Sequence, residues 1–200
     1  MKVIFLWLAF LGTGAAFGQQ FPFEFWHDGK LVLESGDTLT GSIKYDLQSD
    51  LVQFSRGGKL ESFTARKMTY FEIFDQTSRR YRQFYSIPYQ TSGAYKAPVI
   101  FELLAEGKMT LLCRESVEYR SYTNAFYTYG TSTRLVLVYQ YFLLKEDGNI
   151  EIFEGKRNDL LRLMGPQADQ VAKYMKANKL DLADRNEFVQ IVTYYNSLFK

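Results

Sequence analysis

Residues 133–145 read TRLVLVYQYFLLK and indicate the fold class of this chain. Apolar side chains occupy both sets of alternating positions for most of the segment, as is typical of a strand covered on both faces. Asp147 and Gly148 follow as a turn signal, and residues 149–154 (NIEIFE) predict a further short strand. The sequence therefore predicts a hairpin here, with one strand at the centre of a sheet or barrel wall.

On the C-terminal side of this hairpin, the spacing of apolar residues changes to the period of a helix. Asn158 can cap a short first helix, and residues 165–166 (GP) separate it from a second helix that ends near Asn178. Asp184 and Glu187 form a possible capping box for a third helix. The apolar stripe of that third helix comprises Phe188, Ile191, Val192, Tyr195, Leu198 and Phe199.

On the N-terminal side, apolar residues recur at every second position, for example through residues 39–45. Hairpins are predicted within residues 50–64 and 99–114, an edge strand over residues 21–26, and a loop over residues 88–98. The expected fold is α+β: a curved antiparallel β-sheet or partly open β-barrel of about seven to ten strands with two to three C-terminal helices. The β-rich part would span residues 21–155 and the helical part residues 157–199.

The first residues predict export from the cytoplasm. Lys2 supplies a positive charge, residues 3–11 form a short apolar run, and residues 16–18 (AFG) suit a cleavage site. Residues 1–18 are therefore interpreted as a signal peptide and residues 19–200 as a single domain, periplasmic or extracellular. No transmembrane helix is expected in the mature chain, because the apolar run is too short to span a bilayer. Cys113 is the single cysteine, and the alternating pattern around it predicts a buried side chain.

The charge balance argues against a general nucleic-acid binder. The chain has 24 Lys and Arg residues against 22 Asp and Glu residues, whereas such binders carry a basic excess on one face. Arg79, Arg80 and Arg82 form the densest basic spot, which is interpreted as a solvated strand or loop face.

No residue pattern specifies a reaction, a metal or a cofactor. His27 is the single histidine, so a zinc site with two or three histidines is excluded, and His27 is interpreted as an exposed turn residue. A calcium site at Asp46 and Asp50 is permitted, although their spacing matches no EF-hand loop. A glycosidase needs two facing carboxylates, and four glutamates on predicted strands could meet. These are Glu102, Glu115, Glu118 and Glu151.

An aromatic-rich segment after residue 118 is the predicted binding site. Aromatic side chains on a loop offer flat surfaces suited to sugar rings or partner proteins. The candidate binding residues are Tyr119, Tyr122, Phe126, Tyr127 and Tyr129.

Short motifs give the chain a family resemblance. They are residues 36–43 (GDTLTGSI), 143–148 (LLKEDG), 178–180 (NKL) and 194–196 (YYN). With these motifs the chain resembles small exported β-rich proteins of unknown function from Bacteroidota envelopes. The resemblance implies an envelope location and a β-rich body, and it carries over no catalytic or binding residue.

The function expected from the sequence is therefore a non-enzymatic binding or structural module of the envelope, with an envelope protein or glycan as partner. Two alternatives stay open. One is a carboxylate-based hydrolase acting on envelope glycans, which facing acids in a pocket with raised pKa values would favour. The other is an apolar-ligand carrier, which an internal pocket would favour. The helical C-terminal segment argues against an outer-membrane barrel.

Overall fold

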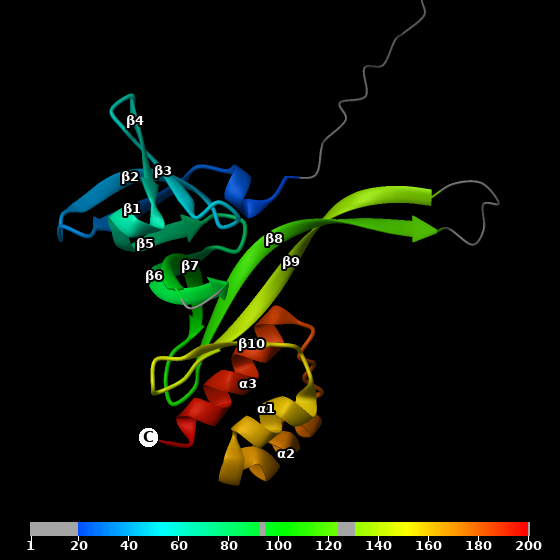
Figure 1. The fold of residues 1–200 in the computed structure, drawn as a ribbon. Helices are drawn as coiled ribbons and strands as arrows, with labels where there is room; N and C mark the ends of the chain where they lie inside the picture. The colour runs from blue at the N-terminus through cyan, green and yellow to red at the C-terminus, as the bar shows by residue number, and fades with distance from the viewer. Residues whose placement is uncertain (1–19, 93–94, 124–130, 200) are drawn as a thin grey trace, which may run out of the picture.

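The computed structural model describes residues 20–92, 95–123 and 131–199, and the ten strands among them form one open antiparallel sheet (Figure 1). Their spatial order is β10-β9-β8-β7-β6-β5-β1-β2-β3-β4. The strands are β1 His27–Leu33, β2 Thr38–Asp46, β3 Leu51–Arg56, β4 Lys59–Thr64, β5 Met68–Asp75, β6 Arg80–Ser92, β7 Tyr95–Ala105, β8 Thr110–Thr123, β9 Thr131–Leu144 and β10 Ile150–Phe153. The predicted α+β class with a curved antiparallel sheet is confirmed.

Three C-terminal helices lie beside the β7–β10 part of the sheet (Figure 1). They are α1 Arg157–Leu163, α2 Ala168–Asn178 and α3 Arg185–Ser197. Asp184 caps α3 as predicted, because its carboxylate accepts from the N–H groups of Asn186 and Glu187 at 2.8 and 3.0 Å. Glu187 does not complete a capping box, since its side chain accepts from the N–H of Asp181. No helix in the described part of the chain is both long and apolar enough to cross a bilayer.

The buried side chains form three separate clusters among the described residues. Phe188, Ile191, Val192 and Tyr195 of α3 pack with Leu111 and Leu143 of the sheet, so the predicted helix stripe is confirmed apart from the exposed Phe199. A second cluster fills the curl of β1–β6, where the Phe71 and Phe84 rings stack at 4.4 Å. A third, smaller cluster joins β7, β8 and β9 and comprises Val99, Phe101, Leu112 and Phe142.

The predicted hairpins are present, but the predictions for residues 21–26 and 88–98 were wrong. Residues 22–24 form a short 3-10 helix (η1, Pro22–Glu24) instead of an edge strand. Pro22 suits the first helical position, and Glu24 accepts from the N–H of Phe21 at 3.0 Å. Residues 88–98 are not a loop, because β6 and β7 continue through them with Pro88 opposite Pro98. Pro88 lies beyond the part of β6 that pairs with β5, and Pro98 lies beyond the part of β7 that pairs with β8. The missing N–H groups of the two prolines therefore take no hydrogen-bond donor away from β5 or β8.

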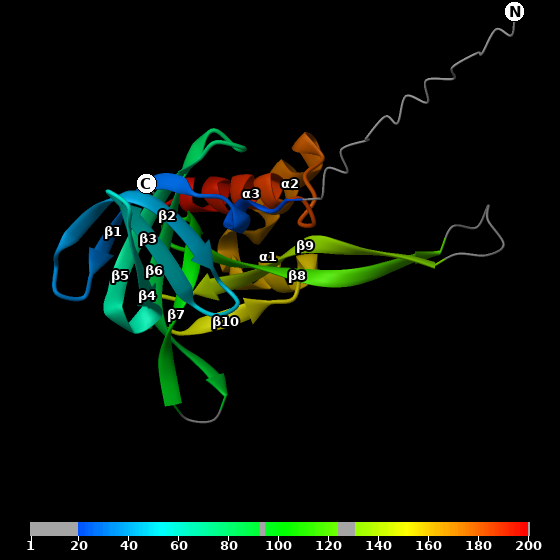
Figure 2. The same ribbon diagram turned by 90° about the horizontal axis from the view of Figure 1, so that it is seen from above.

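Strand β9 was predicted to be central, but most of its length has a neighbouring strand on one side only. It pairs with β8 from Thr131 to Leu144, but β10 covers only Tyr141 to Leu144. Strand β8 in turn pairs with β7 only through Cys113. The distal parts of β8 and β9 therefore leave the sheet together as a two-stranded ribbon that projects from the body (Figures 1 and 2).

Candidate functional site

The projecting ribbon is the first candidate site, and we call residues 117–123 of β8 with residues 131–137 of β9 the arm. Within the arm, β8 and β9 pair only with each other among the described strands. Each strand therefore presents an outer edge of unpaired N–H and C=O groups. Such edges are templates for pairing with another chain.

The two faces of the arm differ in chemistry. Directly opposed residues share a face, and successive residues alternate between faces. The register therefore places four apolar side chains on one face, the apolar face: Val117, Tyr119, Leu135 and Leu137. The other, charged face carries Glu118, Arg120 and Arg134 together with Tyr122 and Val136. None of these nine residues belongs to the buried clusters of the described chain.

Two of the predicted binding tyrosines lie on the arm, though on a strand and not on a loop. Tyr119 is 76% exposed and Tyr122 is 47% exposed. The register puts them on opposite faces, so they do not form one aromatic platform. Phe126, Tyr127 and Tyr129 lie outside the described residues.

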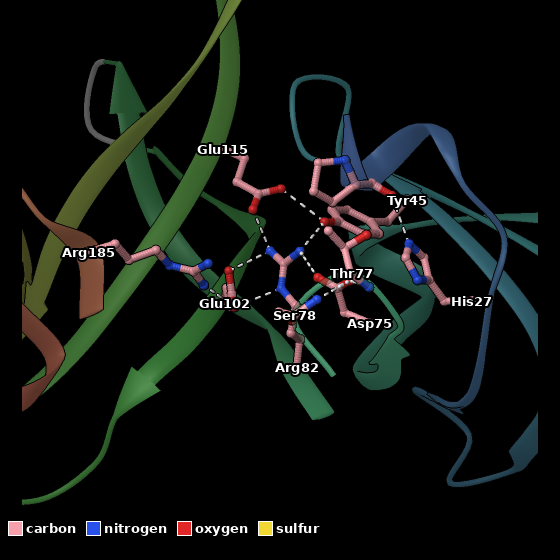
Figure 3. Close-up of polar contacts among 10 residues, drawn as sticks. His27, Tyr45, Asp75, Thr77, Ser78, Arg82, Glu102, Glu115 and Arg185 are labelled. Carbon is pink, nitrogen blue, oxygen red and sulfur yellow. Dashed lines mark hydrogen bonds and ion pairs between the residues drawn. The ribbon is translucent and has the colours of Figure 1, made fainter. Parts of the chain in front are cut away.

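A buried charge cluster at the base of the arm is the second candidate site (Figure 3). Arg82 of β6, whose side chain is 1% exposed, donates to both carboxylate oxygens of Glu102 on β7 at 2.9 and 2.7 Å. It also donates to Glu115 on β8 at 2.5 Å and to the Tyr45 hydroxyl on β2 at 2.8 Å. Asp75 of β5 lies 3.4 Å away.

The cluster joins strands that the sheet order keeps apart. Tyr45 of β2 donates to Glu115 of β8 at 2.9 Å, although β7, β6, β5 and β1 lie between these two strands in the sheet order. The sheet therefore curls until β2 faces β8. Arg185 of α3 donates to Glu102 from the helical side, so the cluster also fastens the helices to the curled sheet (Figure 3). A second ion pair also closes the curl: Arg114 of β8 pairs with Asp50, which lies between β2 and β3, at 2.7 Å.

The electrostatics of the cluster favour charged, paired groups. Burial by itself would raise the pKa of Glu102, but the Arg82 and Arg185 guanidinium groups outweigh it and hold that pKa below its usual value. Burial likewise opposes ionisation of Asp75, while the backbone N–H groups of Ser78 and Thr77 and the charge of Arg82 lower its pKa overall. Burial raises the pKa of Tyr45, which keeps its hydroxyl protonated as a donor.

Two of the four predicted glutamates meet, since Glu102 and Glu115 share Arg82. A general acid of a glycosidase needs a raised pKa, whereas the pKa of Glu102 is lowered. The adjoining cavity, which touches Glu115 and Ser116, has a volume of about 20 Å³, room for about one water molecule. Glu118 and Glu151 are exposed elsewhere, on the arm and on β10. The arrangement is suited to holding strands together.

The larger depressions of the described surface are open and mixed in character. One of about 380 Å³ lies beside the helices where β8 begins and β9 ends, and Lys108, Lys145, Glu146 and Tyr195 help to line it. The inside of the curl is filled by aromatic rings and Arg82, with Tyr45 and Phe84 at 4.8 Å. This filling offers no support to the carrier alternative.

The remaining sequence candidates have structural positions. His27 is not an exposed turn residue as predicted: it is 4% exposed at the start of β1, and its Nε2 lies 2.8 Å from the carbonyl of Pro22. Cys113 is buried as predicted, and burial raises its pKa. Asp46 accepts from the N–H of Gln48 in the β2–β3 turn, while Asp50 pairs with Arg114. No group of three potential metal ligands occurs within the described residues.

Sequence reasoning missed the charge cluster, since Arg82 was interpreted as solvated. A signal was present in the strand phase. Arg82 is two positions from the buried Phe84, and Glu115 is two positions from the buried Cys113. Charges in phase with core residues on separate strands indicate inward pairing.

No known protein family, curated protein or solved structure matches the chain.

Proposed function

We propose that this protein is an exported envelope protein that acts as a non-enzymatic binding module, and that the arm is its contact surface for a partner protein. One observation carries the proposal: the arm holds apolar side chains and two open strand edges outside every buried cluster of the described chain. A purely structural role would leave this surface without a use.

A protein partner suits the arm better than a glycan. An open strand edge recognises an extended peptide through backbone hydrogen bonds, and alternate side chains give specificity. The apolar face would add buried area to such a contact. Sugar binding calls for aromatic rings gathered on one surface, whereas Tyr119 and Tyr122 point to opposite faces.

The envelope location rests on the sequence. The charged start, the apolar run of residues 3–11 and the small residues at 16–18 support export, as does the resemblance to exported envelope proteins. Mass spectrometry of the protein recovered from producing cells should give Gln19 as the first residue. Recovery of a chain that still begins at Met1 would contradict export by cleavage.

Photo-crosslinking in producing cells tests the binding role. A benzophenone amino acid replaces Tyr119 or Tyr122 on the arm, and the matched control replaces Tyr81, which is 68% exposed on β6. We expect protein adducts from the arm positions and none from Tyr81. Adducts that a muramidase removes would instead indicate a glycan partner. Folded protein without any adduct at Tyr119 or Tyr122 would refute the arm as a contact surface.

A further inference from the structure

On the arm, the outer edge of β8 carries one acidic and one basic residue, on either side of Tyr119. If this edge pairs antiparallel with an identical edge, the acidic residue of each strand can lie opposite the basic residue of the other. The edge runs Val117, Glu118, Tyr119, Arg120, Ser121, and β7 has left the strand before it begins. We propose that this edge pairs with the same edge of a second copy of the chain, antiparallel, with Tyr119 opposite Tyr119 of the second copy. This inference rests on the proposed function and names the partner that the arm binds.

Symmetry restricts the possible registers. Two identical strands pair antiparallel about a twofold axis perpendicular to the ribbon, and such an axis keeps each face on its own side. A residue can then meet only residues of the same face, so one residue must lie opposite its own copy. Near the middle of the edge, that residue is Glu118, Tyr119 or Arg120.

The charges select among these three registers. Pairing centred on Glu118 or on Arg120 would bring like charges directly opposite each other, which destabilises a sheet. Pairing centred on Tyr119 places Glu118 opposite Arg120 of the second copy, twice by symmetry. Within one copy, the Arg120 guanidinium Nη2 lies 3.9 Å from the Glu118 carboxylate Oε2. Both side chains are more than half exposed, so both are accessible to a second strand.

The same register joins the apolar faces. The four-stranded order β9-β8-β8-β9 would bring Val117, Tyr119, Leu135 and Leu137 of both copies onto one continuous surface. Tyr119, now 76% exposed, would lie at its centre. The outer edge of β9 is a poorer candidate, because Arg134 is the sole charged residue among its residues 133–140. Self-pairing of β9 would therefore gain no opposite charge.

Charge reversal tests this pairing in the purified chain. E118R makes the edge wholly basic and R120E makes it wholly acidic, so each variant alone would meet its own charge. We expect sedimentation to show a wild-type dimer and at least about tenfold weaker self-association of each single variant. The matched control, E151R on β10, has the same charge change as E118R and should dimerise like the wild type.

Mixing separates the proposed contact from general charge effects. An equimolar mixture of E118R and R120E should form a heterodimer, and the double variant E118R/R120E should dimerise like the wild type. Circular dichroism should show that all variants stay folded, since both side chains are exposed. A monomeric wild-type chain, single variants that dimerise normally, or a mixture that stays monomeric would each overturn the inference. Arm crosslinks to a different protein alongside a monomeric chain would overturn self-pairing alone and leave the proposed function standing.

Discussion

Replacing the buried Arg82 with Met should destabilise the fold more than replacing a surface arginine with Met. Arg82 faces three buried carboxylates, those of Glu102, Glu115 and Asp75. Removing one partner of a buried ion pair costs about 3–5 kcal/mol, because the other charge is left uncompensated. Met has a similar length and supplies none of the five donors.

The remaining contacts of the cluster limit this cost. Glu102 would keep Arg185, Glu115 would keep the Tyr45 hydroxyl, and Asp75 would keep two backbone N–H groups. We therefore expect a loss within about 3–5 kcal/mol and not a multiple of it. For a domain of this size, that loss lowers the unfolding midpoint by about 6–20 °C.

The pH dependence gives this prediction a definite sign. In the wild type, the folded-state pKa values of Glu102 and Asp75 are lowered, so their stabilisation is present above the unfolded-state pKa and is lost as pH falls through the folded-state values. Without Arg82, burial should raise the pKa of Glu102 in the folded state. The destabilisation should therefore shrink as acidification protonates that carboxyl.

Thermal and urea unfolding at neutral and mildly acidic pH measure both effects. Arg56→Met is the matched control, since Arg56 is exposed at the end of β3. The triple variant Arg82→Met/Glu102→Gln/Glu115→Gln should regain part of the loss, because two of the three carboxylates would be neutralised. An Arg82→Met chain as stable as the Arg56→Met control, or a stability difference that widens in acid, would refute this account of the cluster.

Three further predictions concern the packing of the body. Asn196→Ala should lower the free energy of unfolding in urea by about 1–3 kcal/mol, because the Asn196 side-chain amide accepts from the N–H and donates to the C=O of Met109, each at 2.8 Å. The control Asn178→Ala removes one exposed hydrogen bond, and an equal loss in the two variants would contradict a stabilising role for the Asn196 contacts. Gly29→Ala should cost about 1–3 kcal/mol, since its Cβ would lie 2.1 Å from the carbonyl oxygen of Glu72; an unchanged urea midpoint would show that β1 and β5 can separate freely. Ending the chain before Asp184 removes α3 and should give insoluble protein, whereas a soluble truncation with cooperative unfolding would contradict the role of α3.

Local patterns predicted the elements whose signals are local. Alternation and turn residues gave the hairpins, and the helical stripe gave the buried face of α3. Pro22 and the prolines at 88 and 98 misled the predictions, because a proline suits a helix start, a loop or an uncovered strand equally well. The buried His27 forms a hydrogen bond with the Pro22 carbonyl, and the spacing of apolar residues in the sequence does not predict that contact.

The candidate site was only partly predictable, since it depends on strand order. The tyrosines at 119 and 122 were singled out, but their separation onto two faces required the β8–β9 register. The apolar run around Leu135 predicted a central strand, because sequence alone does not show where β10 ends alongside β9 or where β7 ends alongside β8. The arm is the result of those two endings.

Thermal unfolding of a chain without its arm tests most directly whether the arm serves binding and not folding. Ser116 and Val138 are opposed, so Asn-Gly can join them in place of residues 117–137. In dilute solution the midpoint should stay within about 3 °C of the intact chain, because none of the removed residues that the structure describes, 117–123 and 131–137, belongs to a buried cluster. A large drop in the midpoint, or loss of cooperative unfolding, would show that the arm is part of the folding core.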